Sequence, residues 1–206
     1  MTRFRLSCGG AAHETVIPFA GEHYVLNALP GVALALSLGM TPEEIVPALE
    51  RLRQAEMRGR VLRFREGFTV IDDSYNSSPR ALQSMIEVLA AVPGFSRRIL
   101  FAGEMLELGS DSPRLHFECG EFAAKRDIDM VVGVAGIAGE IVRAAEKNGT
   151  EKMITCFFKT SEEAAKFASE NIRPGDLALV KGSRGVHMEK IVSVVSGLVV
   201  SSLLVV

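Results

Sequence analysis

The 206-residue sequence has no tryptophan and only three cysteines, Cys8, Cys119 and Cys156. The cysteines are scattered, and no pair has the spacing of metal ligands, which argues against a disulfide framework and favours a reducing cytoplasm. The formal net charge is only -2, so the composition provides no basic surface for nucleic acid or for an anionic membrane. We therefore expect a cytoplasmic protein without a nucleic-acid partner.

The apolar C-terminal segment is shorter than an ordinary membrane-spanning helix. No residue from Ile191 to Val206 is charged, but this run of about 16 residues falls short of the roughly 20 that a spanning helix needs. We expect a buried terminal helix that continues as a tail over residues 197–206, with a membrane anchor as the less favoured alternative. The N-terminal residues Thr2 to Arg5 lead into glycine and alanine, which is not the pattern of a signal peptide.

Common motifs of catalysis and nucleotide binding are also missing. The sequence has no Gly-x-x-x-x-Gly-Lys-Ser/Thr loop, so a nucleotide site built from these residues alone lacks the usual phosphate cradle. It has no His/Cys metal spacing and no Ser/His/Asp set with an evident geometry. Gly133, Gly136 and Gly139 depart from the Gly-x-Gly-x-x-Gly fingerprint and indicate a tight strand-to-helix turn instead.

The residues that are present predict an α/β fold. The sequence is 48% hydrophobic and 23% charged, which suffices for a globular core. Predicted strands alternate with predicted helices after about residue 60. The strands are expected at 61–64, 68–71, 98–102, 130–134, 153–158 and 177–180, and the helices at 79–92, 113–126, 138–148, 162–171 and from about 186. This alternation predicts a Rossmann-like, mostly parallel sheet with helices on both faces.

The first sixty residues have a different pattern. Two short strands are expected around Phe4 and at 15–19, and two helices follow. Pro30 and Gly31 should bend or weaken the first helix, whereas the second begins with a capping box at Thr41-Pro-Glu-Glu44. Two strands do not form a stable sheet alone, so we expect their partners outside this sequence. The polar residues 54–60 predict a domain boundary.

Polar clusters follow three of the predicted strands. They are Asp72-Asp-Ser-Tyr-Asn-Ser-Ser-Pro79, Gly103-Glu-Met-Leu-Glu-Leu-Gly109 and Lys181-Gly-Ser-Arg184. Because the carboxyl ends of parallel strands share one edge of a sheet, the three turns can form a single rim where a ligand binds.

Each cluster allows a functional and a structural interpretation. Asp73 can accept hydrogen bonds from ribose hydroxyls, or the first cluster can serve only for turns and capping. Lys181, Ser183 and Arg184 can bind a phosphate or carboxylate, or they can form a solvated loop. Glu104 can pair with these cations, lie near a metal or have a purely structural role.

Glu107 shares these three alternatives with Glu104. His23 is expected to cap or pack at the start of a helix, and His116 to pack inside an amphipathic helix.

Taken together, these motifs resemble the Mur ligase family. The resemblance rests on Gly21-Glu-His-Tyr-Val-Leu-Asn27, Gly59-Arg60, the three clusters and His116, and in order and spacing it covers nearly the whole chain apart from the apolar tail. The Asp-Asp-Ser-Tyr-Asn and Glu-Met-Leu-Glu-Leu-Gly pair resembles the members that add D-alanyl-D-alanine to UDP-N-acetylmuramoyl-tripeptide in peptidoglycan synthesis.

The resemblance implies an ATP- and Mg²⁺-dependent amide ligase, in which a carboxylate becomes an acyl phosphate that the incoming amine attacks. It implies that residues 1–57 are the end of the central ATP-binding domain, and that residues 58–196 are the C-terminal domain. The family's phosphate loop, magnesium-binding Glu and modified lysine would lie upstream. The chain alone is then expected to be inactive and to hold no catalytic residue.

The resemblance also assigns binding residues by position. His23 and Asn27 match the motif that contacts adenine, Arg60 the arginine that reaches the phosphates, and Asp73 the carboxylate that holds the ribose. Tyr24 stands where the family usually has a second Asn.

Three further residues, Asn76, Lys181 and Ser183, are candidates for contacts with the substrates. The turn Asn76-Ser-Ser-Pro79 replaces the commoner Asn-Ala-Asn-Pro, so Ser78 offers a shorter polar group. Two other functions stay open. One is a folylpolyglutamate synthase-like ligase, and the other is a noncatalytic module that binds a ligand or partner.

Overall fold

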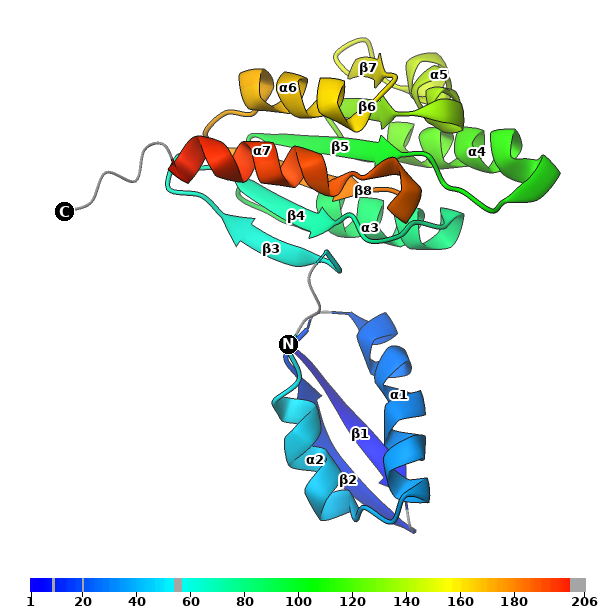
Figure 1. Ribbon diagram of the computed structural model, residues 1–206, viewed down its shortest axis with the longest axis vertical. Coiled ribbons are helices and arrows are strands. Elements are labelled where there is room, and N and C mark those ends of the chain that lie inside the picture. The colour runs from blue at the N-terminus through cyan, green and yellow to red at the C-terminus, as the bar shows by residue number, and fades with distance from the viewer. Residues whose placement is uncertain (9, 20, 54–56, 201–206) are drawn as a thin grey trace. The chain divides into compact units, whose positions relative to one another are not determined.

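The computed structural model describes residues 1–8, 10–19, 21–53 and 57–200, apart from the side chains of residues 23 and 198–200. The chain divides into two compact units, Met1–Ala55 and Glu56–Val206 (Figure 1). The first residues of the boundary expected at 54–60, and the last six of the expected tail, lie outside the described residues.

The Met1–Ala55 unit contains two strands and two helices, as the sequence predicts. Strands β1 (Thr2–Cys8) and β2 (Ala11–Ile17) pair antiparallel. Helices α1 (Glu22–Ser37) and α2 (Pro42–Glu50) pack on them. The small core contains Leu6, Val32, Ile45 and Leu49. At the start of α2 the expected capping box is present, and in it the backbone N–H of Thr41 donates to the Glu44 carboxylate over 2.9 Å.

Helix α1 is continuous through Pro30 and Gly31, although both were expected to bend or weaken it. Proline at position i removes the hydrogen bond to the carbonyl of residue i−4, which here is Leu26. Leu26 is exposed, so water can reach that carbonyl, and the helix tolerates the proline at its surface.

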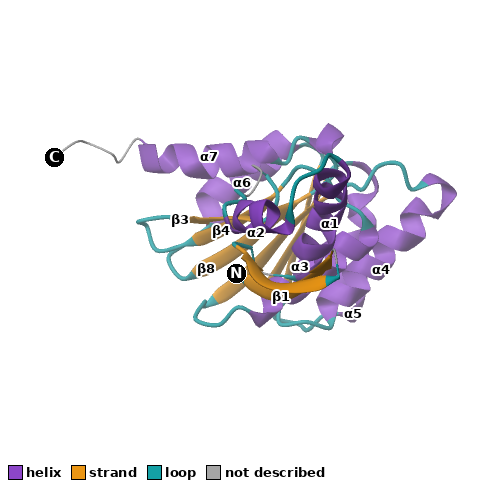
Figure 2. Ribbon diagram, turned by 90° about the horizontal axis from the view of Figure 1, so that it is seen from below, coloured by secondary structure: helices purple, strands orange, loops and turns teal. Residues whose placement is uncertain are grey.

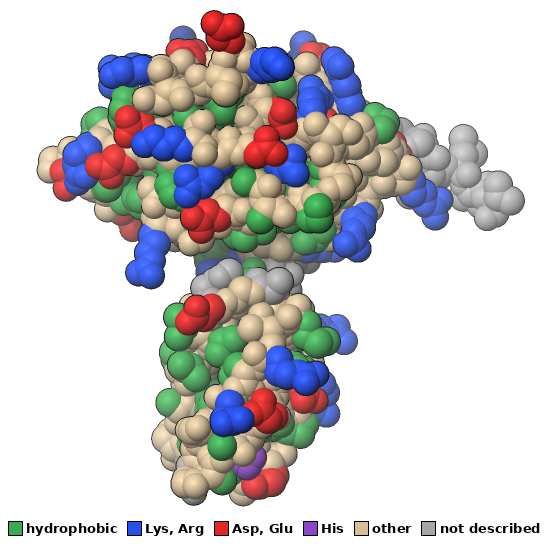
Figure 3. Space-filling model, turned by 180° about the vertical axis from the view of Figure 1, so that it is seen from behind, with side chains coloured by type: hydrophobic (Ala, Val, Ile, Leu, Met, Phe, Trp, Pro, Cys, Tyr) green, Lys and Arg blue, Asp and Glu red, His purple; other side chains and the backbone are tan. Residues whose placement is uncertain are grey.

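The surface of α1 carries an unusual number of large apolar side chains. Leu26 and Leu34 are 57% and 60% exposed, Leu29 is exposed as well, and Leu38, directly after the last residue of α1, is 76% exposed. Figure 3 shows hydrophobic side chains among the charged ones on the surface of this unit. Large exposed apolar side chains in such number are typical of a surface that another part of a protein covers.

The Glu56–Val206 unit contains a six-stranded sheet in the order β3-β4-β8-β5-β6-β7. Its strands are β3 (Arg60–Arg63), β4 (Thr69–Asp73), β5 (Arg97–Gly103), β6 (Met130–Val134), β7 (Ile154–Phe158) and β8 (Asp176–Lys181). Only β3 is antiparallel to its neighbour, and the other pairs are parallel. The predicted α/β fold with a mostly parallel sheet is confirmed.

Helices cover both faces of this sheet, because both faces of its central strands are apolar. The helices are α3 (Pro79–Ala91), α4 (Ser112–Ala124), α5 (Gly139–Asn148), α6 (Ser161–Asn171) and α7 (Glu189–Val200), with short 3₁₀ turns at Gly109–Asp111, Gly136–Ala138 and Arg184–Val186. Helices α6 and α7 enclose one core, and α3, α4 and α5 enclose the other (Figure 2). Within the described residues, no helix has the length and apolar character needed to cross a bilayer.

The sheet places the last strand of the chain at its centre. Strand β8 lies between β4 and β5, although β4 and β5 are consecutive in the sequence. In the parallel register of β4 and β8, Asp73 lies opposite Lys181. The final residues of these two strands therefore share one face at the carboxyl edge of the sheet.

Helices α4 and α5 approach each other closely at Gly120. A Cβ atom built on Gly120 would overlap the backbone carbonyl oxygen of Ile141 and would lie 2.7 Å from Cβ of Ala144. No side chain other than hydrogen fits there, so this glycine sets the distance between the two helices.

Cys119, beside that glycine, is expected to resist thiol reagents in the folded protein. Its side chain is fully buried, and burial raises the pKa of the thiol to about 12. The thiolate is the reactive form, and at pH 8 only about one such thiol in ten thousand is ionised. Iodoacetamide followed by mass spectrometry should leave Cys119 unmodified under native conditions. In urea all three cysteines should react at similar rates. Rapid native labelling of Cys119 would contradict the packing described for α4.

Candidate functional site

The turns that follow β4, β5, β6 and β8 meet at the carboxyl edge of the sheet, as the sequence predicts for three of them. We call these four turns the rim. Their contacts show which polar side chains form hydrogen bonds or ion pairs within the fold and which are exposed to solvent.

In the turn after β4, the structural interpretation holds for Asp72. Its buried Oδ1 accepts hydrogen bonds from the Ser74 hydroxyl at 2.6 Å and from the Ser74 backbone N–H at 3.3 Å. Asn76 Oδ1 accepts from the backbone N–H of Ser77 at 2.8 Å. Ser78 occupies the N-cap position of α3 without a side-chain capping bond. Asp72 and Asn76 thus shape the turn.

The structure brings together three residues that the sequence analysis predicted separately as site residues: Asp73, Asn76 and Lys181. Lys181 Nζ lies 2.6 Å from Asp73 Oδ2 and donates to the Asn76 carbonyl over 2.8 Å. The Lys181 side chain is only 5% exposed and that of Asp73 16%. The alternative of a solvated loop at Lys181 is therefore wrong: this lysine is the end of a central strand.

Ser183 joins the turn after β8 to the turn after β5. Its hydroxyl accepts from the backbone N–H of Leu106 at 2.9 Å, and its own N–H donates to the Glu104 carbonyl over 3.1 Å. The Ser183 residue is buried, whereas Arg184 beside it is exposed.

Glu104 joins the turn after β5 to the turn after β6. Its Oε1 accepts from the backbone N–H of Ile137 at 3.1 Å. Gly136 has a φ of +43°, and a Cβ atom there would overlap the Glu104 carboxylate, so the turn needs glycine. Of the three alternatives for Glu104, the structural one is confirmed. In the described part of the chain, no three His, Cys, Asp or Glu side chains gather as a metal site.

These contacts connect all four turns of the rim. Three of its non-glycine residues also have positive φ values: Glu107 at 65°, Ala135 at 66° and His187 at 59°. Backbone conformations of this kind persist only where the surroundings hold them, and they often occur at ligand sites. The rim is thus a pre-organised edge rather than a set of independent loops.

His116 supports the rim from beneath. It is fully buried on α4, its Nε2 accepts from the backbone N–H of Met105 at 2.8 Å, and its Nδ1 lies 2.7 Å from the Ser112 carbonyl. Only a neutral imidazole with hydrogen on Nδ1 satisfies both contacts. The expected packing role is confirmed.

The sequence did not reveal a cluster of arginines around Tyr75. The guanidinium carbons of Arg58 and Arg184 lie 4.3 and 5.9 Å from the centre of the Tyr75 ring. The backbone N–H of Tyr75 donates to the Met57 carbonyl over 3.0 Å, and Arg184 pairs with Glu189 at 3.3 Å. The cluster joins residues more than a hundred positions apart, and no local motif could have indicated it.

The remaining nominated residues lie on two units. Arg60 is exposed at the first position of β3, opposite Asp72 in the ladder. Asn27 is exposed on α1 of the Met1–Ala55 unit. His23 also belongs to α1, but its side chain lies outside the described part of the chain.

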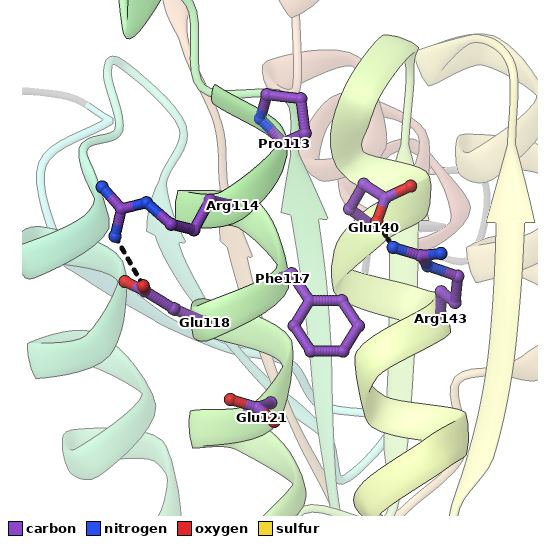
Figure 4. A pocket seen from close by; sticks show the side chains of 7 residues that line it. All are labelled: Pro113, Arg114, Phe117, Glu118, Glu121, Glu140 and Arg143. Carbon is purple, nitrogen blue, oxygen red and sulfur yellow. Dashed lines mark hydrogen bonds and ion pairs between the residues drawn. The ribbon is translucent and has the colours of Figure 1, made fainter. Parts of the chain in front are cut away.

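A surface groove of about 370 Å³ lies between α4 and α5 (Figure 4). It is lined by Pro113, Arg114, Phe117, Glu118, Glu121, Glu140 and Arg143. Arg114 pairs with Glu118 at 2.6 Å, and Arg143 pairs with Glu140. None of the predicted site residues lines this groove, so the rim is the better candidate site.

The sequence and the structure that carry the rim are similar to known proteins of one family. Residues 57–184 match the family model described as "Mur ligase, glutamate ligase domain". The sequence is 31% identical over 183 residues to the UDP-N-acetylmuramoyl-tripeptide--D-alanyl-D-alanine ligase of Bacillus subtilis, an alignment that covers 89% of this chain and 40% of that protein. The chain spans about 40% of the length of the curated relatives it matches.

Two solved structures are similar over nearly the whole chain. A crystal structure of MurF from Acinetobacter baumannii matches with a TM-score of 0.82 and 31% identity, over 95% of this chain and 42% of that one. A MurF ligase from Thermotoga maritima, solved in complex with ADP, matches with a TM-score of 0.71 and 25% identity, over 97% of this chain and 44% of that one.

Proposed function

The chain belongs to the Mur ligase family, and we propose that it is the C-terminal part of a ligase that joins D-alanyl-D-alanine to UDP-N-acetylmuramoyl-tripeptide. The observation that carries this proposal is the 31% identity to such a ligase over 89% of the chain. The activity would serve peptidoglycan synthesis in the cytoplasm, and with it cell-wall growth, cell shape and division. The free thiols of Cys8, Cys119 and Cys156 suit that compartment.

We further propose that residues 1–57 are the end of a central ATP-binding domain and residues 58–196 the C-terminal domain, followed by a tail. The exposed leucines of α1 support the first assignment, because a helix with this surface would be covered by the rest of such a domain. The relatives' greater length leaves room for that domain.

For ATP, we propose that Asp73 accepts the ribose hydroxyls and Arg60 reaches the phosphates, with His23 and Asn27 at the adenine. The chemistry of the residues supports this: Asp73 keeps partial exposure at the carboxyl edge, and Arg60 is an exposed cation. The ADP complex of a relative supports a nucleotide ligand. ATP supplies the phosphoryl group that activates a carboxylate for attack by an amine.

Magnesium is not assigned to residues of this chain. The described residues offer no cluster of ligands for it, and the family resemblance puts its ligands upstream. The role of this chain would be to hold the nucleotide and the substrates in place, because correct orientation of the reactants lowers the activation barrier of the reaction.

For the substrates, the exposed surface of the rim is the best candidate. Asn76 is exposed there, and the guanidinium groups of Arg58 and Arg184 lie beside the Tyr75 ring, with Arg184 also paired to Glu189. Phosphate and carboxylate groups of a nucleotide-linked peptide would be attracted to such a surface.

The test is a ligation assay on the full-length protein, with mass spectrometry of the product. We expect full-length protein, ATP, Mg²⁺, UDP-N-acetylmuramoyl-tripeptide and D-alanyl-D-alanine to yield the pentapeptide product. The 206-residue chain alone should yield none. Addition of glutamate to a folate instead would support the folylpolyglutamate synthase alternative, and no ligation at all would support a noncatalytic module.

A further inference from the structure

We infer that Lys181 is a positioning residue, whose buried ammonium holds Asp73 in the orientation that accepts ribose hydroxyls. The inference deepens the proposed function and rests on it, because the ribose contact of Asp73 belongs to that proposal. It also replaces the expectation that Lys181 itself contacts a substrate.

The sheet builds the Lys181–Asp73 pair directly. The two residues end adjacent parallel strands and lie opposite each other in the register. Their side chains therefore project from the same face, and Lys181 Nζ meets Asp73 Oδ2 at 2.6 Å. Removing an ammonium from water to 5% exposure is unfavourable unless a counter-ion is present, and Asp73 is that counter-ion.

The ammonium also fixes the backbone next to the carboxylate. An ammonium has three N–H donors, and one of them bonds to the Asn76 carbonyl at 2.8 Å. One lysine thus holds both Asp73 and the turn that follows it. Arg184, three residues later, is exposed and is better placed to meet a substrate.

Asp73 keeps partial exposure after pairing with Lys181. A carboxylate has two oxygens and about four lone-pair sites, so the ion pair at Oδ2 does not by itself exhaust its capacity to accept hydrogen bonds. The ammonium holds the carboxylate in a single orientation. A charged, oriented acceptor binds a hydroxyl more strongly than one that must reorganise.

The experiment compares ATP with 2′,3′-dideoxy-ATP in the full-length ligase, for the wild type and for Lys181→Met. The wild type should prefer ATP by about tenfold or more in kcat/KM, the range expected for a hydrogen bond to a charged group. Lys181→Met should raise KM for ATP by about tenfold and should leave KM for the dideoxy nucleotide nearly unchanged. The preference should fall to about twofold or less.

A merely structural role of Lys181 would give a different result, because a damaged fold weakens the binding of ATP and of the dideoxy nucleotide alike. The thermal unfolding of each variant should be measured beside its assay. If Lys181→Met does not fold, Lys181→Gln replaces it, because the glutamine amide is too short to reach both Asp73 and Asn76. Lys190→Met is the matched control, since Lys190 pairs with Glu162 on the surface and should retain the wild-type preference.

The outcomes separate the two proposals. If the wild type prefers ATP and both Lys181 variants keep that preference, the positioning role is refuted and the proposed function stands. If the wild type does not ligate, the proposed function fails. If it ligates without preferring ATP, the ligase function stands, but the ribose contact of Asp73 fails and the inference fails with it.

Discussion

Replacing Asp73 by alanine is expected to lower the free energy of unfolding of the 206-residue chain by about 3–5 kcal/mol. The substitution leaves the Lys181 ammonium at 5% exposure without its counter-ion. Breaking a buried ion pair by removing one partner is costly, because the remaining charge has lost both water and its partner. Urea denaturation followed by circular dichroism measures the effect.

A second substitution separates charge from packing. Adding Lys181→Met to Asp73→Ala removes the stranded charge, and the double variant should be more stable than Asp73→Ala alone. Glu162→Gln breaks the exposed pair with Lys190 and should change stability little, since exposed pairs contribute little. If Asp73→Ala were as mild as Glu162→Gln, the Lys181 ammonium would have to be solvated rather than buried.

Gly120→Ala is expected to destabilise the chain by about 3 kcal/mol. The added methyl group would overlap the Ile141 carbonyl oxygen and crowd Ala144, so α4 and α5 must move apart. That movement also loosens α4 at His116, which holds the backbone of Met105. Urea denaturation measures the loss.

Gly197→Ala provides the matched control in α7. A Cβ atom on Gly197 would meet nothing within 4 Å. Alanine has the better helix propensity, so this variant should gain about 0.5 kcal/mol. Equal effects of the two substitutions would mean that helix propensity, and not the contact between α4 and α5, decides the result at Gly120.

The secondary structure of the sheet unit was predictable because its signals are local. Apolar runs bounded by polar turns located all six strands, and the 3.6-residue pattern located the helices. The last helix begins at Glu189, slightly later than expected, because a 3₁₀ turn occupies Arg184–Val186. The continuity of α1 through Pro30 was not predictable, since it depends on the exposure of Leu26.

The candidate site was predictable as a location but not as a network. Parallel strands bring their carboxyl ends together, which correctly placed Asp73 and Lys181 at one edge. The burial of Lys181 depends on β8 lying at the centre of the sheet, and strand order is not a local property. For the same reason the roles of Glu104 and of the Arg58–Tyr75 contact emerged only from the structure.

The central position of β8 has a consequence for synthesis of the protein. During translation β4 and β5 are synthesised early, but each lacks one of its two neighbouring strands until Asp176–Lys181 is made. Until then the nascent sheet consists of two halves with open edges, which are templates for wrong pairing. Closure must span the β4–β8 separation in sequence, which is a slow, non-local step. A nascent chain stopped before β8 would therefore be a substrate for chaperones or proteases rather than a partly folded domain.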